Sequence, residues 1–267
     1  PAASFEEYTL TLTDGEQSVT LQHLLIGEVW LCAGQSNMVM PLNGFDYCPI
    51  SDSNNVIADA PNHPGIRMVT IKPTVKLSPQ EYAEGSWQQP TTENAPKFSA
   101  AAYHYALTLQ RTLQIPIGVI TCAWGGSRVE GWLPKEILQT YKDEDLTLIG
   151  SDKTPVYLQS MLMYNGILYP CHKYTIKGFI WYQGESNVRS SRTYAERLAT
   201  MVKHWRSIWK QGDLPFYYVE TVPFACEYKE DGYIGALLRE AQQKALSLIP
   251  NSGMIGTNDL VETYEAP

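Results

Sequence analysis

The sequence lacks any run of basic residues, and its overall charge is negative. Charged residues make up 18% of the 267 residues, and the formal net charge is -8 at pH 7. Because nucleic acids and anionic membrane surfaces attract clustered lysine and arginine, this pattern makes both poor partners. The longest apolar runs, such as residues 115–124, fall far short of the ~20 residues of a membrane-spanning helix. We therefore expect no nucleic-acid partner and no membrane insertion.

Cysteine is scarce and scattered, with no Cys-x-x-Cys pair. The five positions are Cys32, Cys48, Cys122, Cys171 and Cys226. This spacing does not favour a zinc site. Cys32 and Cys122 stand in apolar segments, so we expect them to be buried as small hydrophobic residues. An odd number leaves at least one thiol without an intrachain partner, and composition leaves the redox compartment open.

No signal peptide is visible in the sequence, which opens with Pro1. This opening favours a processed or dissected start, from which a compartment signal would have been removed. Hydrophobic residues make up 44% of the chain, enough for one large domain or for one domain with a small appendage.

The first segment alternates apolar and polar residues. Alternation over residues 8–25, interrupted by Asp14-Gly15, predicts a β-hairpin. The pattern changes at Gly27, so we interpret residues 1–26 as a hairpin appendage that would fit the tail of a further β domain. Residues 27–267 then form the main domain.

From Gly27 onward, short apolar strands alternate with amphipathic helices. The predicted strands are 28–32, 66–71, 117–123, 176–182, 215–221 and 253–257, and the predicted helices are 97–113, 193–209 and 233–248. Thr193 and Glu196 have the spacing of a capping box at the start of the second helix. Such alternation predicts an α/β fold with a mostly parallel central sheet that is covered by helices on both faces.

The strand that begins at Glu28 ends at Gly34 and is followed by Gln35 and Ser36. A strand that ends in Gly-x-Ser places a small nucleophile at the carboxyl edge of a sheet, where α/β folds build their sites. The Ser36 backbone N–H is then free to bind an anion. Considered alone, the motif is equally compatible with an ordinary turn that carries a serine.

Two further polar, glycine-containing loops follow predicted strands. They span residues 123–132 and 183–187. In a parallel sheet, all three loops would meet at one edge. Gly126 could then offer a second backbone N–H and Gln183 a side-chain amide to an oxyanion at Ser36. One such donor typically lowers a barrier by ~3–4 kcal/mol.

These three motifs resemble those of the SGNH (GDSL-like) hydrolases and, within them, the sialate O-acetylesterase family. The matching segments are residues 30–38, 124–127 and 176–187, with weaker matches at 164–166, 239–242 and 257–260. The resemblance implies a three-layer, flavodoxin-like α/β/α sandwich. It also implies a serine esterase that removes acetyl groups from sugars, without a metal or organic cofactor, in a secreted or periplasmic location. By position, Ser36 is the nucleophile, and Gly126 and Gln183 complete the oxyanion hole.

The general base of the family is a histidine in an Ile-His-Pro-like context near the C-terminus. None of the five histidines stands in that context; they are His23, His63, His104, His172 and His204. We expect these to have structural or surface roles. The base would then lie on a removed or separate segment, or this chain would be unable to turn over.

Other polar and aromatic residues near the motifs allow two interpretations each. Glu185 could orient the catalytic histidine, or it could hold its own loop. Arg128 could pair with Glu130, which we favour, or meet an acidic sugar. Trp132, Trp181 and Tyr182 could stack on a sugar, although large aromatic residues beside a site are more often part of the core.

Two alternatives to sialate deacetylation stay open at this point. One is an acetylxylan esterase or other polysaccharide acetylesterase, since the motifs bind the acetyl group rather than the sugar. The other is a non-catalytic carbohydrate-binding module on the same scaffold. The absent histidine favours this second alternative, whereas the converging oxyanion donors argue against it.

Overall fold

The computed structural model describes residues 2–223 and 233–260, and Cys226 lies outside these ranges. Its centre is a six-stranded sheet with the strand order β4-β5-β3-β6-β7-β8. The strands are β3 (Glu28–Gly34), β4 (Ile66–Thr70), β5 (Ile117–Ala123), β6 (Gly178–Tyr182), β7 (Phe216–Val219) and β8 (Ser252–Ile255). Every neighbouring pair in this sheet is parallel, as the alternation of strands and helices predicts.

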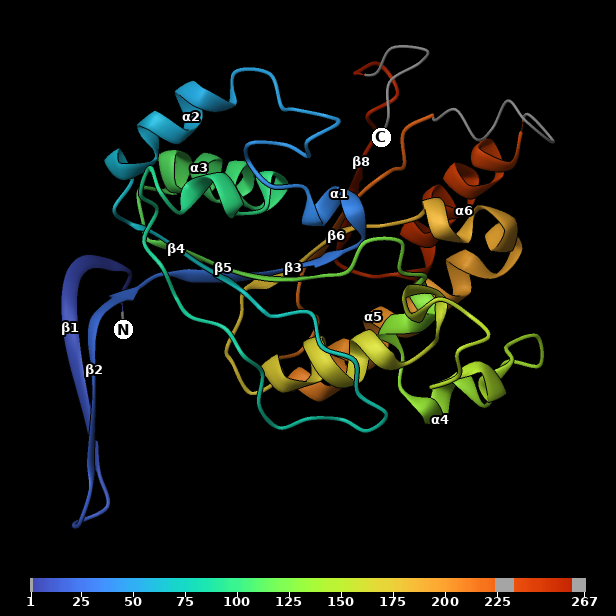
Figure 1. Ribbon diagram of the computed structural model, residues 1–267, viewed down its shortest axis with the longest axis horizontal. Helices are drawn as coiled ribbons and strands as arrows, with labels where there is room; N and C mark the ends of the chain where they lie inside the picture. The colour runs from blue at the N-terminus through green and yellow to red at the C-terminus, as the bar shows by residue number, and fades with distance from the viewer. Residues whose placement is uncertain (1, 224–232, 261–267) are drawn as a thin grey trace.

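Helices cover both faces of the sheet (Figure 1). They are α1 (Ser36–Val39), α2 (Ser53–Asp59), α3 (Ala100–Leu113), α4 (Lys135–Leu138), α5 (Ser191–Trp209) and α6 (Ile234–Leu248). The alternation of side chains along β3 divides the core into two parts. Trp30 and Cys32 pack with the residues of α3, whereas Leu31 and Ala33 pack with those of α5 and α6. The three-layer α/β/α prediction is therefore confirmed.

The capping box predicted for α5 is wrong. A 3-10 helix at Glu185–Ser190 leads directly into α5, which begins at Ser191, two residues before Thr193. The Thr193 hydroxyl donates back to the Ser190 carbonyl instead of capping an amide, and Glu196 pairs with Lys244 on α6 at 2.7 Å. Because α5 already begins at Ser191, the amides of residues 195 and 196 have carbonyl partners one turn earlier in the helix and need no cap from Thr193.

The N-terminal segment forms a separate two-stranded antiparallel hairpin of β1 (Ser4–Thr13) and β2 (Ser18–Ile26), which projects from the main body (Figure 1). Leu10 lies opposite Leu21 and Leu12 opposite Val19, and all four side chains are exposed. A two-stranded hairpin is marginal by itself in water. The assignment of residues 1–26 to a further β domain stays a prediction.

The cysteines predicted to be buried are buried. Cys32 and Cys122 are inaccessible to solvent, and burial raises the pKa of both thiols. Cys122 lies 3.9 Å from Cys171, sulfur to sulfur, and both are free thiols. In the part of the chain that the structure describes, no helix combines the length and the apolar character needed to cross a bilayer.

Candidate active site

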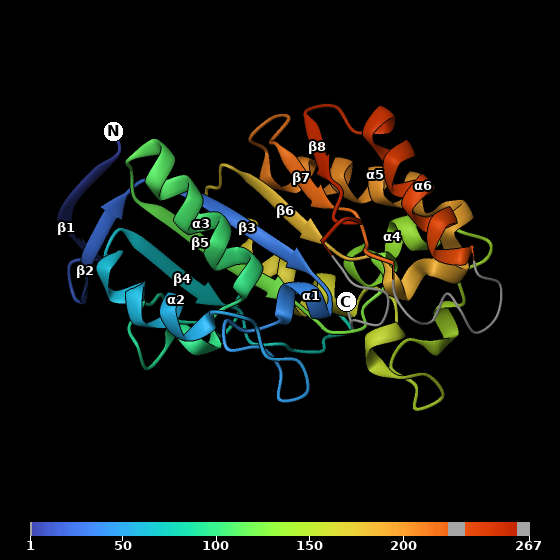
Figure 2. The same ribbon diagram turned by 90° about the horizontal axis from the view of Figure 1, so that it is seen from above.

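The strand order brings the three predicted loops together. β3 lies between β5 and β6, and Gly34 is in register with Ala123 on one side and Tyr182 on the other. The three strands therefore end at the same level and point their carboxyl ends toward α1 (Figure 2). Ser36, Gly126 and Gln183 each follow directly, so the predicted meeting of these loops at one sheet edge is confirmed.

Ser36 is the first residue of α1 and is partly exposed. The turn before it needs glycine, since a β-carbon on Gly34 would lie 2.1 Å from the Tyr182 carbonyl oxygen. That oxygen instead accepts the Gln35 N–H at 3.0 Å, which fixes the turn to β6. A β-carbon on Gly125 would lie 3.9 Å from Cβ of Ser36, so the glycine turn after β5 borders the serine.

Two backbone N–H groups next to the serine find no acceptor within residues 2–223 and 233–260. Among the described residues, neither the Ser36 nor the Gly126 amide donates a hydrogen bond. Gly126 has a φ of 75°, and its carbonyl accepts a 2.7 Å bond from the Ser186 hydroxyl. The left-handed backbone, which suits glycine, turns the Gly125-Gly126 segment around the serine. Unpaired amides beside a partly exposed serine are the donors that a tetrahedral oxyanion requires.

Gln183 is fully buried and its amide is already engaged. Its Nε2 donates to the Ser127 carbonyl at 3.0 Å and to Asn187 Oδ1 at 2.8 Å, and its Oε1 accepts from the Tyr194 hydroxyl. Both amide hydrogens are therefore used. A role of Gln183 as third oxyanion donor would require one of these bonds to be released, and it stays a prediction.

Glu185 connects the first and third motifs. Its Oε1 accepts a 2.7 Å hydrogen bond from the Asn37 side-chain amide. Its Oε2 is enclosed and has no partner among the described residues. Burial raises the pKa of this carboxyl, whereas hydrogen bonds from its own amide and from Asn37 act in the opposite direction. A buried carboxylate oxygen without a donor is positioned to accept an additional N–H, which fits the orienting role predicted for Glu185.

A buried polar network, which the sequence alone does not reveal, lies behind the site. Asn187 accepts from Val129 N–H and Gln183, and it donates to Glu130 at 3.0 Å. Glu130 has no exposed surface and pairs with Arg197 of α5. The network joins the second and third loops to the helix layer. Its members are far apart in the sequence, so only the three-dimensional structure shows that they are in contact.

The predicted Arg128–Glu130 pair exists, but it is not the main contact of Arg128. Arg128 lies 3.7 Å from Glu130 and 2.7 Å from Glu144. Its Nε also donates to the Leu158 carbonyl at 3.0 Å. Arg128 therefore fastens the second loop to Glu144 and to the 3-10 turn at Val156–Leu158, as the structural interpretation expects.

The large aromatic residues near the loops belong to the core. Trp132 and Trp181 are fully buried and pack edge-to-face with ring centroids 5.8 Å apart. Their indoles are therefore unavailable for stacking on a sugar. Tyr182 keeps partial exposure. Val39, Trp124 and Gly125 are among the residues that line a small cavity of about 170 Å³, and Gly125 borders Ser36.

The histidines have partners elsewhere in the molecule. His23 binds Glu7, His63 binds Asp59, and His204 lies 2.8 Å from the Tyr164 hydroxyl. His172 contacts the Tyr169 carbonyl, and His104 packs against Tyr103 on α3. Within the described residues, none of the five contacts Ser36 or Glu185.

Comparisons with known proteins show the family to which the chain belongs. A family model described as carbohydrate esterase, sialic acid-specific acetylesterase matches residues 26–266. The chain belongs to this family. Sialate O-acetylesterase from Homo sapiens is 26% identical over 257 residues, which cover 90% of this chain and 48% of the human protein. The corresponding protein from Pongo abelii is also 26% identical, with the same coverage.

Solved structures share the fold of this chain. A carbohydrate acetylesterase from Xanthomonas citri has a TM-score of 0.86 and 30% identity, and the match covers 99% of this chain and 57% of that one. A protein from Arabidopsis thaliana, with a TM-score of 0.56 and 18% identity, covers 88% of this chain and shows the shared fold alone. The chain spans about half the length of the sialate O-acetylesterases from Homo sapiens and Pongo abelii that it matches.

Proposed function

We propose that this protein is a serine esterase that removes O-acetyl groups from carbohydrates, with O-acetylated sialic acid as the preferred substrate. The observation that carries this proposal is the convergence of Ser36 with the unpaired N–H groups of Ser36 and Gly126 at one sheet edge. The family match supports the choice of an acetylated sugar as substrate.

The reaction is a two-step acyl transfer. The Ser36 hydroxyl oxygen attacks the acetyl carbonyl carbon while its proton passes to a base. The carbonyl oxygen becomes an oxyanion that the two N–H groups bind, and the sugar hydroxyl leaves with a proton. Water then attacks the acetyl-serine, which releases acetate and restores the hydroxyl.

The proposed base is a histidine that would donate its other ring N–H to Oε2 of Glu185. This arrangement gives the buried carboxylate oxygen the donor that it lacks among the described residues. Because the five histidines of this sequence contact other residues, we infer that the base comes from polypeptide outside residues 1–267.

The test is intact-mass analysis after reaction with a fluorophosphonate, which phosphonylates an activated serine. It is applied to this chain and to any longer product of the same gene, each with a Ser36→Ala control. We expect the longer product to gain one adduct at Ser36 and this chain to react at least ~100-fold more slowly, since a serine without its base is a poor nucleophile. If the longer product is also unreactive, the esterase proposal fails and the binding-module alternative replaces it.

Substrate preference is measured separately as acetate release. Unlabelled, active protein is incubated either with 9-O-acetylated sialic acid or with acetylated xylo-oligosaccharides, and the rates of acetate release are compared. Faster release from the sialic acid ester supports the proposed substrate. Faster release from the xylan fragments favours a polysaccharide acetylesterase.

A further inference from the structure

A second cavity, of about 510 Å³, lies at the opposite edge of the sheet from Ser36. Its lining includes Val29 near the start of β3 and Gly118 near the start of β5. Ser36 follows the other end of β3, so the length of that strand separates the two sites by roughly 20 Å. The volume is in the range typical of small-molecule sites, about 300–1,000 Å³.

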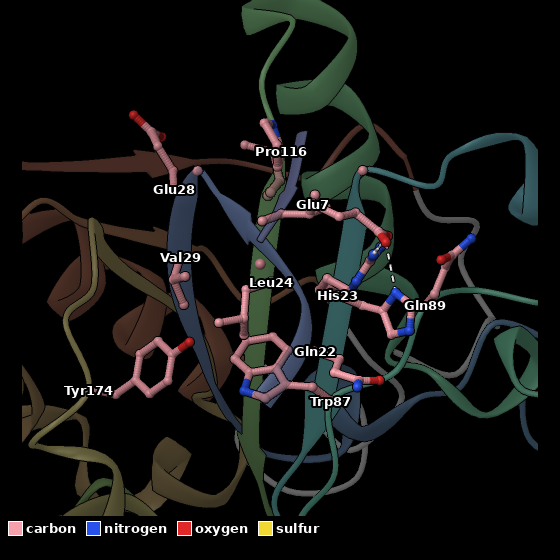
Figure 3. A pocket seen from close by; sticks show the side chains of 16 residues that line it. Glu7, Gln22, His23, Leu24, Glu28, Val29, Trp87, Gln89, Pro116 and Tyr174 are labelled. Atoms are coloured by element: carbon pink, nitrogen blue, oxygen red, sulfur yellow. Dashed lines mark hydrogen bonds and ion pairs between the residues drawn. The ribbon is translucent and has the colours of Figure 1, made fainter. Parts of the chain in front are cut away.

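Two aromatic side chains, Trp87 and Tyr174, line this cavity, and Figure 3 shows the indole between Tyr174 and Gln22. The ring centroids are 5.8 Å apart, and the side chains are 37% and 46% exposed. An indole that packed only as core would be covered, as Trp132 and Trp181 are. Exposed aromatic faces offer a flat apolar surface to the C–H groups of a ligand ring.

The backbone holds both aromatic residues in place. Gln88, next to Trp87, exchanges two hydrogen bonds with Met68 of β4, at 2.8 and 2.9 Å. A β-carbon on Gly118 would lie 3.4 Å from the indole, so the glycine leaves room for the ring on β5. The carbonyl of Tyr174 accepts from the Trp209 indole at 3.0 Å. The rings are therefore preorganised, which lowers the entropy cost of binding.

Several polar groups lie around the aromatic pair in the lining of the cavity. The Trp87 indole N–H, the Tyr174 hydroxyl and the side-chain amides of Gln22 and Gln89 make no hydrogen bond to any residue that the structure describes. Amides and hydroxyls can both donate and accept, as sugar hydroxyls do. Stacking surfaces together with such groups suit a sugar ring better than a purely apolar ligand.

The charge of the cavity distinguishes neutral from acidic sugars. Glu7 and Glu28 line it, whereas its one arginine, Arg67, lies 3.4 Å from Glu7 and is paired with it. His23 also binds Glu7, at 2.7 Å (Figure 3). No unpaired cation among the described lining residues would attract a carboxylate, so the lining disfavours sialic acid itself.

We propose that this cavity is a second carbohydrate-binding site, which takes a neutral, unacetylated sugar through stacking on Trp87 and hydrogen bonds to Gln22 and Gln89. The choice of a sugar as ligand rests on the proposed function. The site would hold the neutral part of a glycan while an acetylated unit, on the same or a neighbouring glycan, reaches Ser36.

Isothermal titration calorimetry with lactose and xylobiose tests this proposal. The protein carries Ser36→Ala, and neither sugar has an ester, so the result does not depend on esterase activity. We expect saturable binding of at least one sugar. Trp87→Ala should weaken it about tenfold or more, whereas Trp87→Phe, which keeps an aromatic face, should stay within about threefold.

Two further variants complete the test. Gln89→Ala removes a side chain that makes no hydrogen bond to described residues, so it should fold normally and bind several-fold more weakly. Tyr47→Ala removes an aromatic ring that is 81% exposed and does not line the cavity, and it should bind as the parent does. Absence of saturable binding to both sugars, or equal binding by Trp87→Ala, overturns the proposal. Tighter, Trp87-dependent binding of 3′-sialyllactose than of lactose overturns its neutral-sugar part.

Discussion

The side chain of Asn37 donates a 2.7 Å hydrogen bond to Glu185, across 148 positions of sequence. The residue after the proposed nucleophile is thereby tied to the loop after β6. The same carboxyl keeps its second oxygen buried and without a donor among the described residues. This contact places an acidic group beside the residue that follows the serine, with capacity for one more hydrogen bond, and it makes Glu185 informative to mutate.

Replacement of Glu185 by Gln is expected to change the pH dependence of stability. Burial raises the pKa of Glu185 in the folded protein. The folded state therefore binds the proton more tightly than the unfolded state, and the resulting stability is full below pH ~4.5 and lost as pH rises. Gln keeps the acceptor for Asn37 but carries no charge to desolvate.

Glu185→Gln should thus be more stable than the parent at pH 7 to 8, with a difference that shrinks toward pH 4.5. Thermal melts at several pH values measure this. Because the amide cannot orient a histidine in the same way, fluorophosphonate labelling should fall even though stability rises. A variant that is less stable at pH 7 would contradict the conclusion that the burial of the Glu185 carboxyl outweighs its hydrogen bonds.

Ser36→Ala is expected to abolish labelling without loss of stability. The Ser36 hydroxyl makes no hydrogen bond to any residue in the described ranges, and the side chain is partly exposed. The free energy of unfolding should therefore change by no more than about 0.5 kcal/mol. Urea unfolding measures the stability, and intact-mass analysis measures the labelling. If the variant is still labelled, at another residue, Ser36 is excluded as the nucleophile.

Gly126→Ala should damage both the backbone and the anion site. The φ of 75° disfavours a side chain, and the new β-carbon would lie 2.8 Å from the Tyr157 ring. We expect a loss of about 1 kcal/mol in the free energy of unfolding. In a longer product that supplies the base, fluorophosphonate labelling of Ser36 should be about 10- to 100-fold slower. Gly125→Ala is the matched control for stability, since its β-carbon meets only Ser36 Cβ at 3.9 Å. Equal destabilisation by both variants would show that the glycine turn, rather than Gly126, is sensitive.

Asn187→Ala should destabilise the protein strongly. The substitution leaves Val129 N–H, Gln183 and Glu130 without one buried partner each. A buried group left unpaired costs about 1–3 kcal/mol, so a total of at least 2 kcal/mol is expected. Asn62→Ala, which removes one exposed bond to Asp59, should cost less than about 0.5 kcal/mol. Similar melting temperatures for the two variants would argue against a structural role for the buried network.

The sequence by itself determined the fold class and which segments form the strands of the parallel sheet, whereas the order of those strands came from the structure. The apolar strands that end at Gly34, Ala123 and Tyr182 are visible as short hydrophobic runs, because a strand covered on both faces has no polar side. The three polar loops behind them could be predicted to meet, because strands in a parallel sheet end at the same edge. The hairpin was recognisable from its alternation and its Asp-Gly turn.

Only the tertiary structure decided how the polar groups are shared. Gln183 fits an oxyanion donor by sequence, yet its amide hydrogens bind Ser127 and Asn187. Asn37 contacts Glu185, which is 148 positions away in the sequence. Glu130 pairs with Arg197 and Arg128 pairs with Glu144, and these partners also lie on other segments. A hydrogen bond requires the donor–acceptor distance to be right within a few tenths of an ångström. Packing between the layers sets these distances, whereas local propensity does not. The cavity around Trp87 is likewise defined by where β2, β3 and β5 come together, which no single segment encodes.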